Sequence, residues 1–336
     1  MTTHYRSLIM IGCLLASACS SAAKGPVSEV MALRSSDDAV QVRAGDEVFA
    51  RVPLNAAQPG VIETLFGHGG RHILRGFPQH PRFGESVDHP EHLSMWMGHA
   101  SVGGFDLWNE AAGPRLVEHS LRMQPGGGAV VVMKLEWQAP SGKVLCSEDR
   151  VYTFRGTDQV RDVDVEIRLT ATGDGVVFGD VREGFFALRL ADGFRVDSGN
   201  ASVQTSTQIE GHDPYGQPAR WIAYTAPIAD EMGALEDVTV SIFDSPGNPG
   251  YPTRWFARPY GLVAANPFAA TAFEDSDAPH QSDDLLKPTV AEGFWLKPYQ
   301  SAAWRYRVAI ARGALDGSAI ESQWMAFTGV GSPKNP

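Results

Sequence analysis

Cysteine is scarce in this sequence, with only Cys13, Cys19 and Cys146 among 336 residues. Cys13 and Cys19 belong to an apolar N-terminal run, "LIMIGCLLASAC", which leaves Cys146 alone in the rest of the chain. A disulfide framework is therefore excluded, and the folded state must be stabilised by its hydrophobic core. The chain is long enough to bury a large core, as one large β-domain or two smaller ones.

Basic clusters and long apolar runs are also missing. The formal net charge is -11, and no group of lysines and arginines provides the basic patch that nucleic-acid phosphates require. The same charge disfavours direct binding to anionic lipid headgroups. No apolar run after the first approaches the length of a membrane span. We therefore expect a neutral or weakly charged small molecule or a glycan as the partner.

Several common catalytic motifs are absent. The sequence has no GxSxG elbow, no P-loop and no GxGxxG between a strand and a helix. "GHGGRH" looks like a phosphate-binding loop only superficially, because no helical pattern follows it. Nucleotide cofactors are disfavoured, and no cofactor is expected.

The N-terminus has the features of an export signal: Arg6, then the apolar run, then "SSAAKGPVSE". Small residues directly before Cys19 are typical of bacterial lipoproteins, so we predict a signal peptide over residues 1–23 with cleavage before a lipidated Cys19. Cleavage at an A-x-A-like site near residues 21–23 is the alternative. The prediction implies a periplasmic or outer-membrane-anchored protein, with a single β-sandwich domain over residues 25–325.

Alternating apolar and polar residues indicate β-strands along most of the chain. Two segments show the pattern most clearly, and their expected inward residues are Val163, Val165, Ile167 and Leu169 in the first and Trp304, Tyr306, Val308 and Ile310 in the second. The charged residues between them, such as Asp164 and Arg307, are expected to point outward. Further candidate strands are residues 39–44, 48–52, 129–137, 150–154, 185–191, 221–225 and 238–244.

Helical periodicity is convincing only in "LDGSAIESQWMAF", residues 315–327. Many short strands without alternating helices predict an all-β fold, and we expect a large antiparallel β-sandwich of two sheets with a short C-terminal helix. Residues 58–128 are less regular, and residues 245–270 are so rich in Pro, Gly and Asn that we predict a long loop there. Long loops on a rigid β-scaffold often carry the function.

Histidines gather in one part of the chain: six of the ten are His68, His72, His80, His89, His92 and His99. The densest stretch is "DHPEHLSMWMGHASVGGFDLWNE", residues 88–110. Asp88 could orient a histidine as a neighbouring carboxylate does, or it could cap a turn at His89 and Pro90. If residues 93–100 form a strand, His92 shares the face of Trp96 and His99 points to the opposite face.

The chemistry of these histidines stays open between acid–base work, metal binding and structural roles. His89, His92 and His99 could ligate a transition metal, but their spacing matches no strong metal motif, and we assign no metal ligand. Aromatic residues such as Trp96 and Trp108 suit stacking on a sugar ring, although on strands they are more often core. Glu183, before an alternating strand, could serve as a general acid or base, or be a solvated turn residue.

The block from residue 88 to 110 resembles the DHP-x-H block of the bacterial PmoA-like proteins, a family labelled "methane oxygenase PmoA". Glu183 with "FFALRLA", then "PTRWFARPYGLVAANPF" and "LKPYQSAAWRYRVAIARG", resemble that family's later blocks in the same order. The resemblance spans residues 38–313. A methane oxygenase subunit would need transmembrane helices, so the resemblance implies a fold and a site position and no oxygenase activity.

The last of these blocks also resembles the final strand of galactose-mutarotase-like β-supersandwiches. That resemblance implies histidines and a carboxylate on a concave sheet, acting on a sugar. By analogy His89 or His92 would be the acid and Glu183 the base.

Our leading hypothesis is an exported carbohydrate-active enzyme, a hydrolase, lyase or epimerase, with catalytic His89, His92 and Glu183. The substrate-binding residues we expect are Asp88, Trp96, His99, His212, Arg254 and Asn266. The alternatives are a non-catalytic glycan-binding lipoprotein and a histidine-ligated metalloenzyme.

Overall fold

The computed structural model describes residues 28–29, 31–54, 60–109, 114–207, 213–274 and 293–330. The predicted export signal, Cys19 and His212 lie outside these residues. Within them, no helix combines the length and the apolar character needed to cross a membrane.

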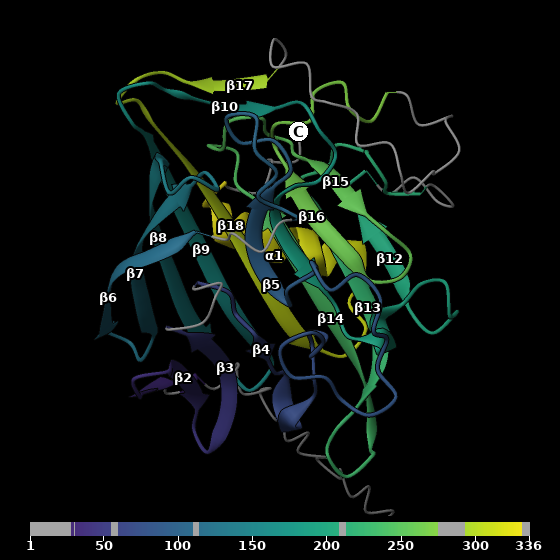
Figure 1. The fold of residues 1–336 in the computed structure, drawn as a ribbon. Helices are drawn as coiled ribbons and strands as arrows, with labels where there is room; N and C mark the ends of the chain where they lie inside the picture. The colour runs from purple at the N-terminus through teal and green to yellow at the C-terminus, as the bar shows by residue number, and fades with distance from the viewer. Residues whose placement is uncertain are drawn as a thin grey trace, which may run out of the picture.

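An eight-stranded antiparallel sheet, the large sheet, forms the back of the molecule in Figure 1. Every segment in it that we predicted as a strand is one. In spatial order its strands are β12 (Ser202–Thr205), β13 (Trp221–Ala229), β14 (Leu235–Asp244), β18 (Ser301–Arg312), β9 (Val160–Ala171), β8 (Val144–Gly156), β7 (Ala129–Gln138) and β6 (Arg115–Met123).

A four-stranded antiparallel sheet, the small sheet, lies in front of the large one (Figure 1). Its strands in order are β15 (Arg254–Ala257), β16 (Leu262–Asn266), β11 (Gly184–Arg189) and β5 (Met95–His99). The two sheets give the all-β, antiparallel sandwich that the sequence predicts.

The remaining elements flank the two sheets. A second four-stranded sheet contains β1 (Met31–Ser35), β2 (Ala39–Ala44), β3 (Glu47–Pro53) and β4 (Thr64–Leu65), and a two-stranded ribbon pairs β10 (Val176–Gly179) with β17 (Gly293–Leu296). The helices are η1 (His68–Gly70), η2 (Asp192–Phe194) and α1 (Gly317–Thr328).

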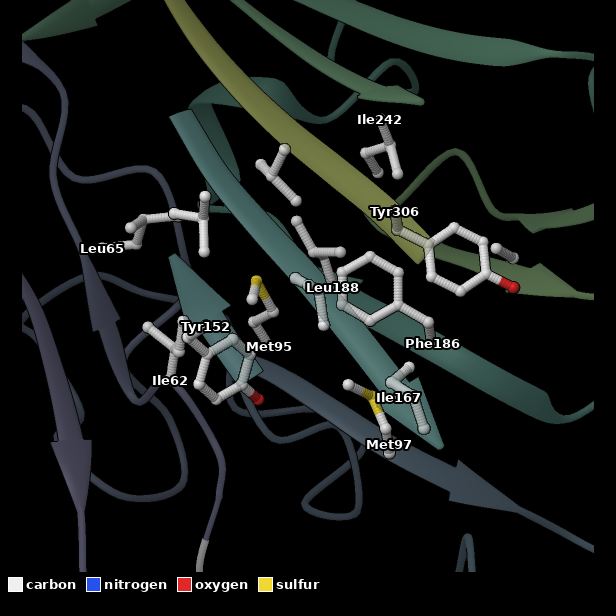
Figure 2. Packing of buried hydrophobic residues seen from close by; sticks show 14 of the residues in the cluster. Ile62, Leu65, Met95, Met97, Tyr152, Ile167, Phe186, Leu188, Ile242 and Tyr306 are labelled. Carbon is white, nitrogen blue, oxygen red and sulfur yellow. The ribbon is translucent and has the colours of Figure 1, made fainter. Parts of the chain in front are cut away.

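The main core lies between the large and the small sheet. Figure 2 shows Met95, Met97, Phe186 and Leu188 of the small sheet facing large-sheet side chains that include Ile167. The inward residues predicted on β9 and β18 are all buried, so their alternation was read correctly. Burying a side chain of this size contributes about 1.5–3 kcal/mol, which explains why the alternating pattern determines the sheet faces.

Helix α1 covers part of the other face of the large sheet, and Figure 1 shows it behind the strands. Its N-cap Asp316 accepts a hydrogen bond from the amide of Ala319 (2.8 Å), and Trp324 and Phe327 pack against the sheet. Arg307, expected to be solvated, lies over the ring of Phe327 and pairs with Asp164, which is only 1% exposed. The expectation of a solvated face is therefore wrong at Asp164, because the helix and arginine side chains cover it.

Residues 245–270 are not one long loop. They contain β15 and β16, joined by a tight hairpin in which the Arg258 amide donates to the Leu262 carbonyl (2.8 Å) and the Gly261 amide donates to the Arg258 carbonyl (3.0 Å). Gly261 has φ +95°, a conformation that favours glycine. The sequence analysis missed β15 and β16 because each strand is only four or five residues long and lies among turn-forming residues.

A buried ion pair, Glu148 with Arg150, lies on the inner face of the large sheet and is called the core pair below. Glu148 accepts hydrogen bonds from Arg150 Nε (2.5 Å) and Nη2 (2.7 Å) and from Trp137 Nε1 (2.7 Å). Arg150 Nη1 and the Tyr152 hydroxyl both donate to the Gly60 carbonyl, at 2.7 and 2.6 Å. The pair thus ties the chain at Gly60 to the sheet.

Candidate functional site

The small sheet has a second face, turned away from the core, which we call the outer face. A separate cluster of buried residues covers it and includes Trp96, Ala187, Leu262, Ala264 and Phe256. These residues come from all four strands, at positions that alternate with core residues. Leu93, Trp96 and Trp108 of the histidine-rich segment belong to this cluster, so the fold brings them next to β11 and β15, which are distant in sequence.

Arg75 holds the loop that carries His89 and His92, and its side chain is fully buried. Its Nη1 donates to the Asp88 carbonyl (2.7 Å) and to Asp88 Oδ1 (2.5 Å), and its Nη2 donates to the His89 carbonyl (2.8 Å). Ser94 donates its hydroxyl to the Arg75 carbonyl (2.9 Å). His89 itself has φ +46°, which costs energy for a non-glycine residue and persists where the surroundings enforce it.

Arg189, at the end of β11, is the second fully buried arginine beneath this loop. Its Nη2 donates to the same Asp88 Oδ1 (2.7 Å), and its guanidinium carbon lies 4.5 Å from the ring centroid of Tyr260. Burial, and then the neighbouring Arg75, lower the pKa of Arg189 to about 10. One carboxylate oxygen therefore serves two buried cations; Arg75, Asp88 and Arg189 are called the site cluster below.

His92 is neutral at any ordinary pH. Burial lowers its pKa to about 2, with further contributions from His89, Arg189 and Arg75. The guanidinium of Arg189 lies 3.3 Å from His92 Nδ1, and because a guanidinium can only donate, Nδ1 must accept. The ring proton is then on Nε2, which lies 3.5 Å from Glu91 Oε1. His92 is a fixed hydrogen-bond donor.

His89 is the exposed member of the pair, with 43% of its side chain accessible. Its ring stacks on that of His92 (centroids 4.6 Å apart, planes at 13°) and on that of Tyr260 (5.1 Å, 16°). Its Nδ1 lies 2.9 Å from Glu91 Oε1. The carboxylate beside the histidines is thus Glu91, whereas the sequence led us to Glu183.

Aromatic rings continue from the histidines across the outer face. His92 lies 5.8 Å from Trp96 and 6.1 Å from Trp108, and Trp108 lies 6.4 Å from Phe256. Phe256 in turn contacts Tyr215 at 5.8 Å. This arrangement confirms that Trp96 shares the face of His92. Trp96, Trp108 and Phe256 are buried, whereas Tyr215 and Tyr260 at the edge of the cluster are partly exposed and are the rings on which a sugar can stack.

Glu183 lies at the start of β11 on the same side of the sheet. Burial raises its pKa; Arg182 and Arg258 act against that effect, and Asp106 adds to it. Glu183 meets the 88–110 segment through its backbone, because its carbonyl accepts a hydrogen bond from the Ala100 amide (2.9 Å). Among the described residues it forms no hydrogen bond or ion pair with His89 or His92.

Three other predicted substrate-binding residues have structural partners. His99 points into the core, is fully buried, and lies 5.7 Å from Phe178 and 5.2 Å from Phe268. Asn266 donates to the carbonyls of Val181 and Arg182 (2.8 and 2.9 Å). Arg254 donates to the Gly216 carbonyl (3.0 Å). His99 is separated from the outer face because its position on β5 alternates with that of Trp96, and we do not assign it to the site.

A metal ion held by His89 and His92 does not fit the geometry. Ligand atoms of His89, Glu91 and His92 do lie within 4.8 Å of one another. A metal must lie close to the plane of each ligating imidazole, on the axis of the nitrogen lone pair. The two rings are stacked and nearly parallel, so they share no such point. His99, the third ligand we considered, is in the core.

A hollow of about 380 Å³ lies on the other face of the large sheet. Its polar lining includes Asp149, Glu166, Arg168 and Arg305, which come from neighbouring strands. Trp304 also borders it, but the Trp304 ring is buried in the core. With no exposed aromatic ring and no histidine, this hollow matches a solvated sheet face, and we place the candidate site on the outer face of the small sheet.

Sequence reasoning missed five residues of the site: Arg75, Glu91, Arg189, Arg258 and Tyr260. Glu91 lies between the two histidines in the printed sequence and could have been found there. The others come from separate strands and a hairpin turn, and no local pattern connects them to the histidine block.

Comparison with known proteins gives a family and a set of distant structural likenesses. A galactose mutarotase-like protein from Clostridium acetobutylicum is similar to this chain with a TM-score of 0.44 and 8% identity, over 85% of this chain and 99% of that one. A putative aldose 1-epimerase from Escherichia coli K12 has a TM-score of 0.35 and 14% identity, over 84% and 99%. Likeness at this level carries no conclusion about activity.

No curated protein matches the sequence. The PmoA-like label suggested by the sequence blocks is not supported by any of these comparisons. Residues 39–325 match the model of a family of unknown function, DUF6807. Because that match covers most of the chain, the protein belongs to the DUF6807 family.

Proposed function

We propose that this protein is an exported carbohydrate-active enzyme in which His89 performs acid–base chemistry on a sugar or sugar derivative. The observation that carries the proposal is the exposed His89 ring, stacked between His92 and Tyr260 with its Nδ1 2.9 Å from Glu91. The partly exposed Tyr260 and Tyr215 supply the stacking surface. Export rests on the predicted signal sequence alone.

Glu91 gives His89 a defined role. If the carboxylate accepts the Nδ1 proton, the lone pair of His89 is on Nε2, which can remove a proton from a sugar hydroxyl. Glu91 then stabilises the imidazolium, as carboxylates do beside catalytic histidines. Deprotonating the anomeric hydroxyl while the ring oxygen is protonated would break the bond between the anomeric carbon and the ring oxygen and give an epimerase of the anomeric centre. Removing a C–H proton next to a carbonyl while a leaving group departs would give a lyase, and deprotonating a water that attacks the anomeric carbon while the leaving oxygen is protonated would give a hydrolase.

His92 and Glu183 take different parts from those the sequence suggested. His92, held neutral, can donate a hydrogen bond from Nε2 but has no proton to release to substrate at neutral pH. Glu183, whose pKa burial raises, could supply a second proton to a substrate that spans from His89 to Arg258. We therefore assign His89 the catalytic role and His92 a positioning role.

The test uses variants of the purified protein and a panel of reducing sugars and methyl glycosides, with products followed by NMR. His89→Gln is expected to lower kcat by about 100-fold or more, and Glu91→Gln by about tenfold or more. His119→Gln, on the exposed face of β6, is the matched control and should leave turnover unchanged. Full activity in both site variants would rule out the proposed chemistry.

A non-catalytic glycan-binding protein is the second candidate, favoured by one observation. Among the described residues, Glu183 contacts neither histidine, so a paired acid and base is not assembled without substrate. This candidate predicts that calorimetry detects binding and that the sugar is recovered unchanged after prolonged incubation. Recovery of an altered sugar would exclude it.

A further inference from the structure

Arg258, at the end of β15, differs from the other arginines of the site. Arg75 and Arg189 are buried and share Asp88, whereas the Arg258 side chain is partly exposed. Among the described residues, no carboxylate forms an ion pair or hydrogen bond with it. An arginine without a counter-ion beside an exposed histidine is available to a ligand.

Two tyrosines hold the Arg258 guanidinium in place. Its central carbon lies 5.3 Å from the ring centroid of Tyr215 and 5.8 Å from that of Tyr260. Arg254, four positions earlier in the chain, donates to the carbonyl of Gly216 and so fixes the chain next to Tyr215. Arg258 also forms a side-chain hydrogen bond with Tyr260. Its remaining donors can face a planar partner, and this pre-organisation limits the entropy lost on binding.

The acids around Arg258 form no ion pair with it among the described residues. Glu183 interacts with Arg258 electrostatically only. Tyr260 lies next to both Arg258 and Arg189, and Arg189 shares Asp88 with Arg75. Of these three arginines, the two that form ion pairs both use Asp88, which leaves the guanidinium of Arg258 for a ligand, in a chain whose net charge is -11.

We propose that the substrate is a sugar bearing a carboxylate, a uronic acid or uronate residue, and that Arg258 binds this carboxylate through paired hydrogen bonds. The inference rests on the proposed function and specifies its substrate class. The sugar ring lies against the partly exposed Tyr260 and Tyr215, with one hydroxyl at His89. The carboxylate selects the substrate because a neutral sugar leaves the guanidinium without a partner. This departs from the neutral partner that the overall charge suggested, because a local cation outweighs distant, screened charges.

The probes are the methyl glycosides of D-glucuronate and D-galacturonate, each paired with its uncharged methyl ester, and the corresponding methyl hexosides carrying an anionic 6-sulfate. Isothermal titration calorimetry is expected to show that the acids bind about tenfold or more tightly than their esters. Arg258→Gln should remove this preference. Arg258→Lys should keep part of it, because the charge remains and the planar fork is lost. Arg168→Gln, on the exposed face of β9, is the matched control and should keep all of it.

Three results would overturn the inference: equal binding of acid and ester, an acid preference that survives in Arg258→Gln, and tighter binding of the 6-sulfates than of the uronates. Each is separable from a failure of the proposed function. Turnover of a neutral sugar that depends on His89 would retain the function and reject the carboxylate. Uronate binding that depends on Arg258, with no turnover by the unaltered protein, would retain the carboxylate and reject the enzyme.

Discussion

The core pair and the site cluster both join arginine to a carboxylate, but they differ in how completely the charges and hydrogen bonds are matched. In the core pair, one glutamate faces one arginine, and every polar atom of both side chains has a partner. In the site cluster, Asp88 serves two arginines, and the Nε atoms of both arginines find no hydrogen-bond partner among the described residues. The pKa of Arg150 is raised in its surroundings, whereas burial lowers that of Arg189 to about 10.

This comparison distinguishes charged residues that stabilise the fold from charged residues that are available to a ligand. A balanced, fully hydrogen-bonded pair can stay in the core and connects elements, as the core pair does at Gly60. In the unbalanced site cluster one positive charge remains uncompensated, and it adds to the burial that holds His92 neutral beside the exposed His89. Strained or under-satisfied groups of this kind concentrate where ligands bind.

The largest expected effect is on the core pair. Glu148→Gln leaves Arg150 charged and buried without a counter-ion, and we expect the free energy of unfolding to fall by about 3–5 kcal/mol. Urea unfolding followed by far-UV circular dichroism measures it. Glu118→Gln, which breaks the exposed pair with Lys134, should cost less than about 1 kcal/mol. Similar losses in the two variants would contradict the contrast.

The second effect is a pH dependence of stability at His92. The folded-state pKa is about 2 and the unfolded value about 6.5, so the unfolded chain binds an additional proton between these values. The contribution of His92 to the free energy of unfolding is complete above pH 6.5. It decreases on acidification, by about 2 kcal/mol from pH 7 to pH 5.

Two buried carboxyl groups act in the opposite direction. Burial raises the pKa of Asp244 to about 7 and that of Asp162 to about 6. Their ionisation in the folded protein is unfavourable, so these two groups lower the free energy of unfolding as pH rises. The measurement is therefore a difference between unfolding curves of the unaltered protein and His92→Gln at several pH values. The difference should shrink on acidification, and a constant difference would show that folding does not change the His92 pKa. His119→Gln should keep the pH dependence of the unaltered protein.

A smaller effect is expected at Arg189. Arg189→Met removes one of two cations from Asp88, which keeps Arg75, so we expect the unfolding free energy to fall by only about 1 kcal/mol. The His92 pKa should rise at the same time, because a neighbouring positive charge is lost; NMR titration of the imidazole protons measures it. A loss as large as that of Glu148→Gln, or an unchanged His92 pKa, would refute the interpretation of the cluster.

The smallest effect concerns reactivity without a change in stability. Cys146 lies in the core near the core pair, and burial raises its thiol pKa, so iodoacetamide should not alkylate it in the native protein. His89 should react with diethyl pyrocarbonate under the same conditions, since its ring is exposed. Mass spectrometry of the two peptides gives both results. Rapid alkylation of Cys146 without unfolding would show that the core region is open.

The fold was readable where a strand is long enough to show its alternation. β9 and β18 each have twelve residues, and both their existence and their inward faces were predicted. β15 and β16 were missed because four or five residues show too little alternation to be recognised among Pro, Gly and Asn. The exposure of Asp164 was also misjudged, since what covers it is a helix far along the chain.

The histidine block was recognisable, but its internal roles were not. The side of the sheet on which His92 and Trp96 lie follows from the period of β5, and it was predicted. The pKa of His92 was beyond prediction, because it depends on burial and on Arg75 and Arg189, which reach it from other strands.

The sequence by itself determined an antiparallel β-fold, a C-terminal helix and the stretch in which to look for a site, because these depend on local periodicity and composition. Only the tertiary structure decided which side chains lie together. It places Glu91 and not Glu183 beside His89, and it buries His99 in the core. It also leaves Arg258 at the site without an ion-pair partner among the described residues. Electrostatic energies depend on separation in space and on burial, and neither quantity is encoded in the spacing of residues along the chain.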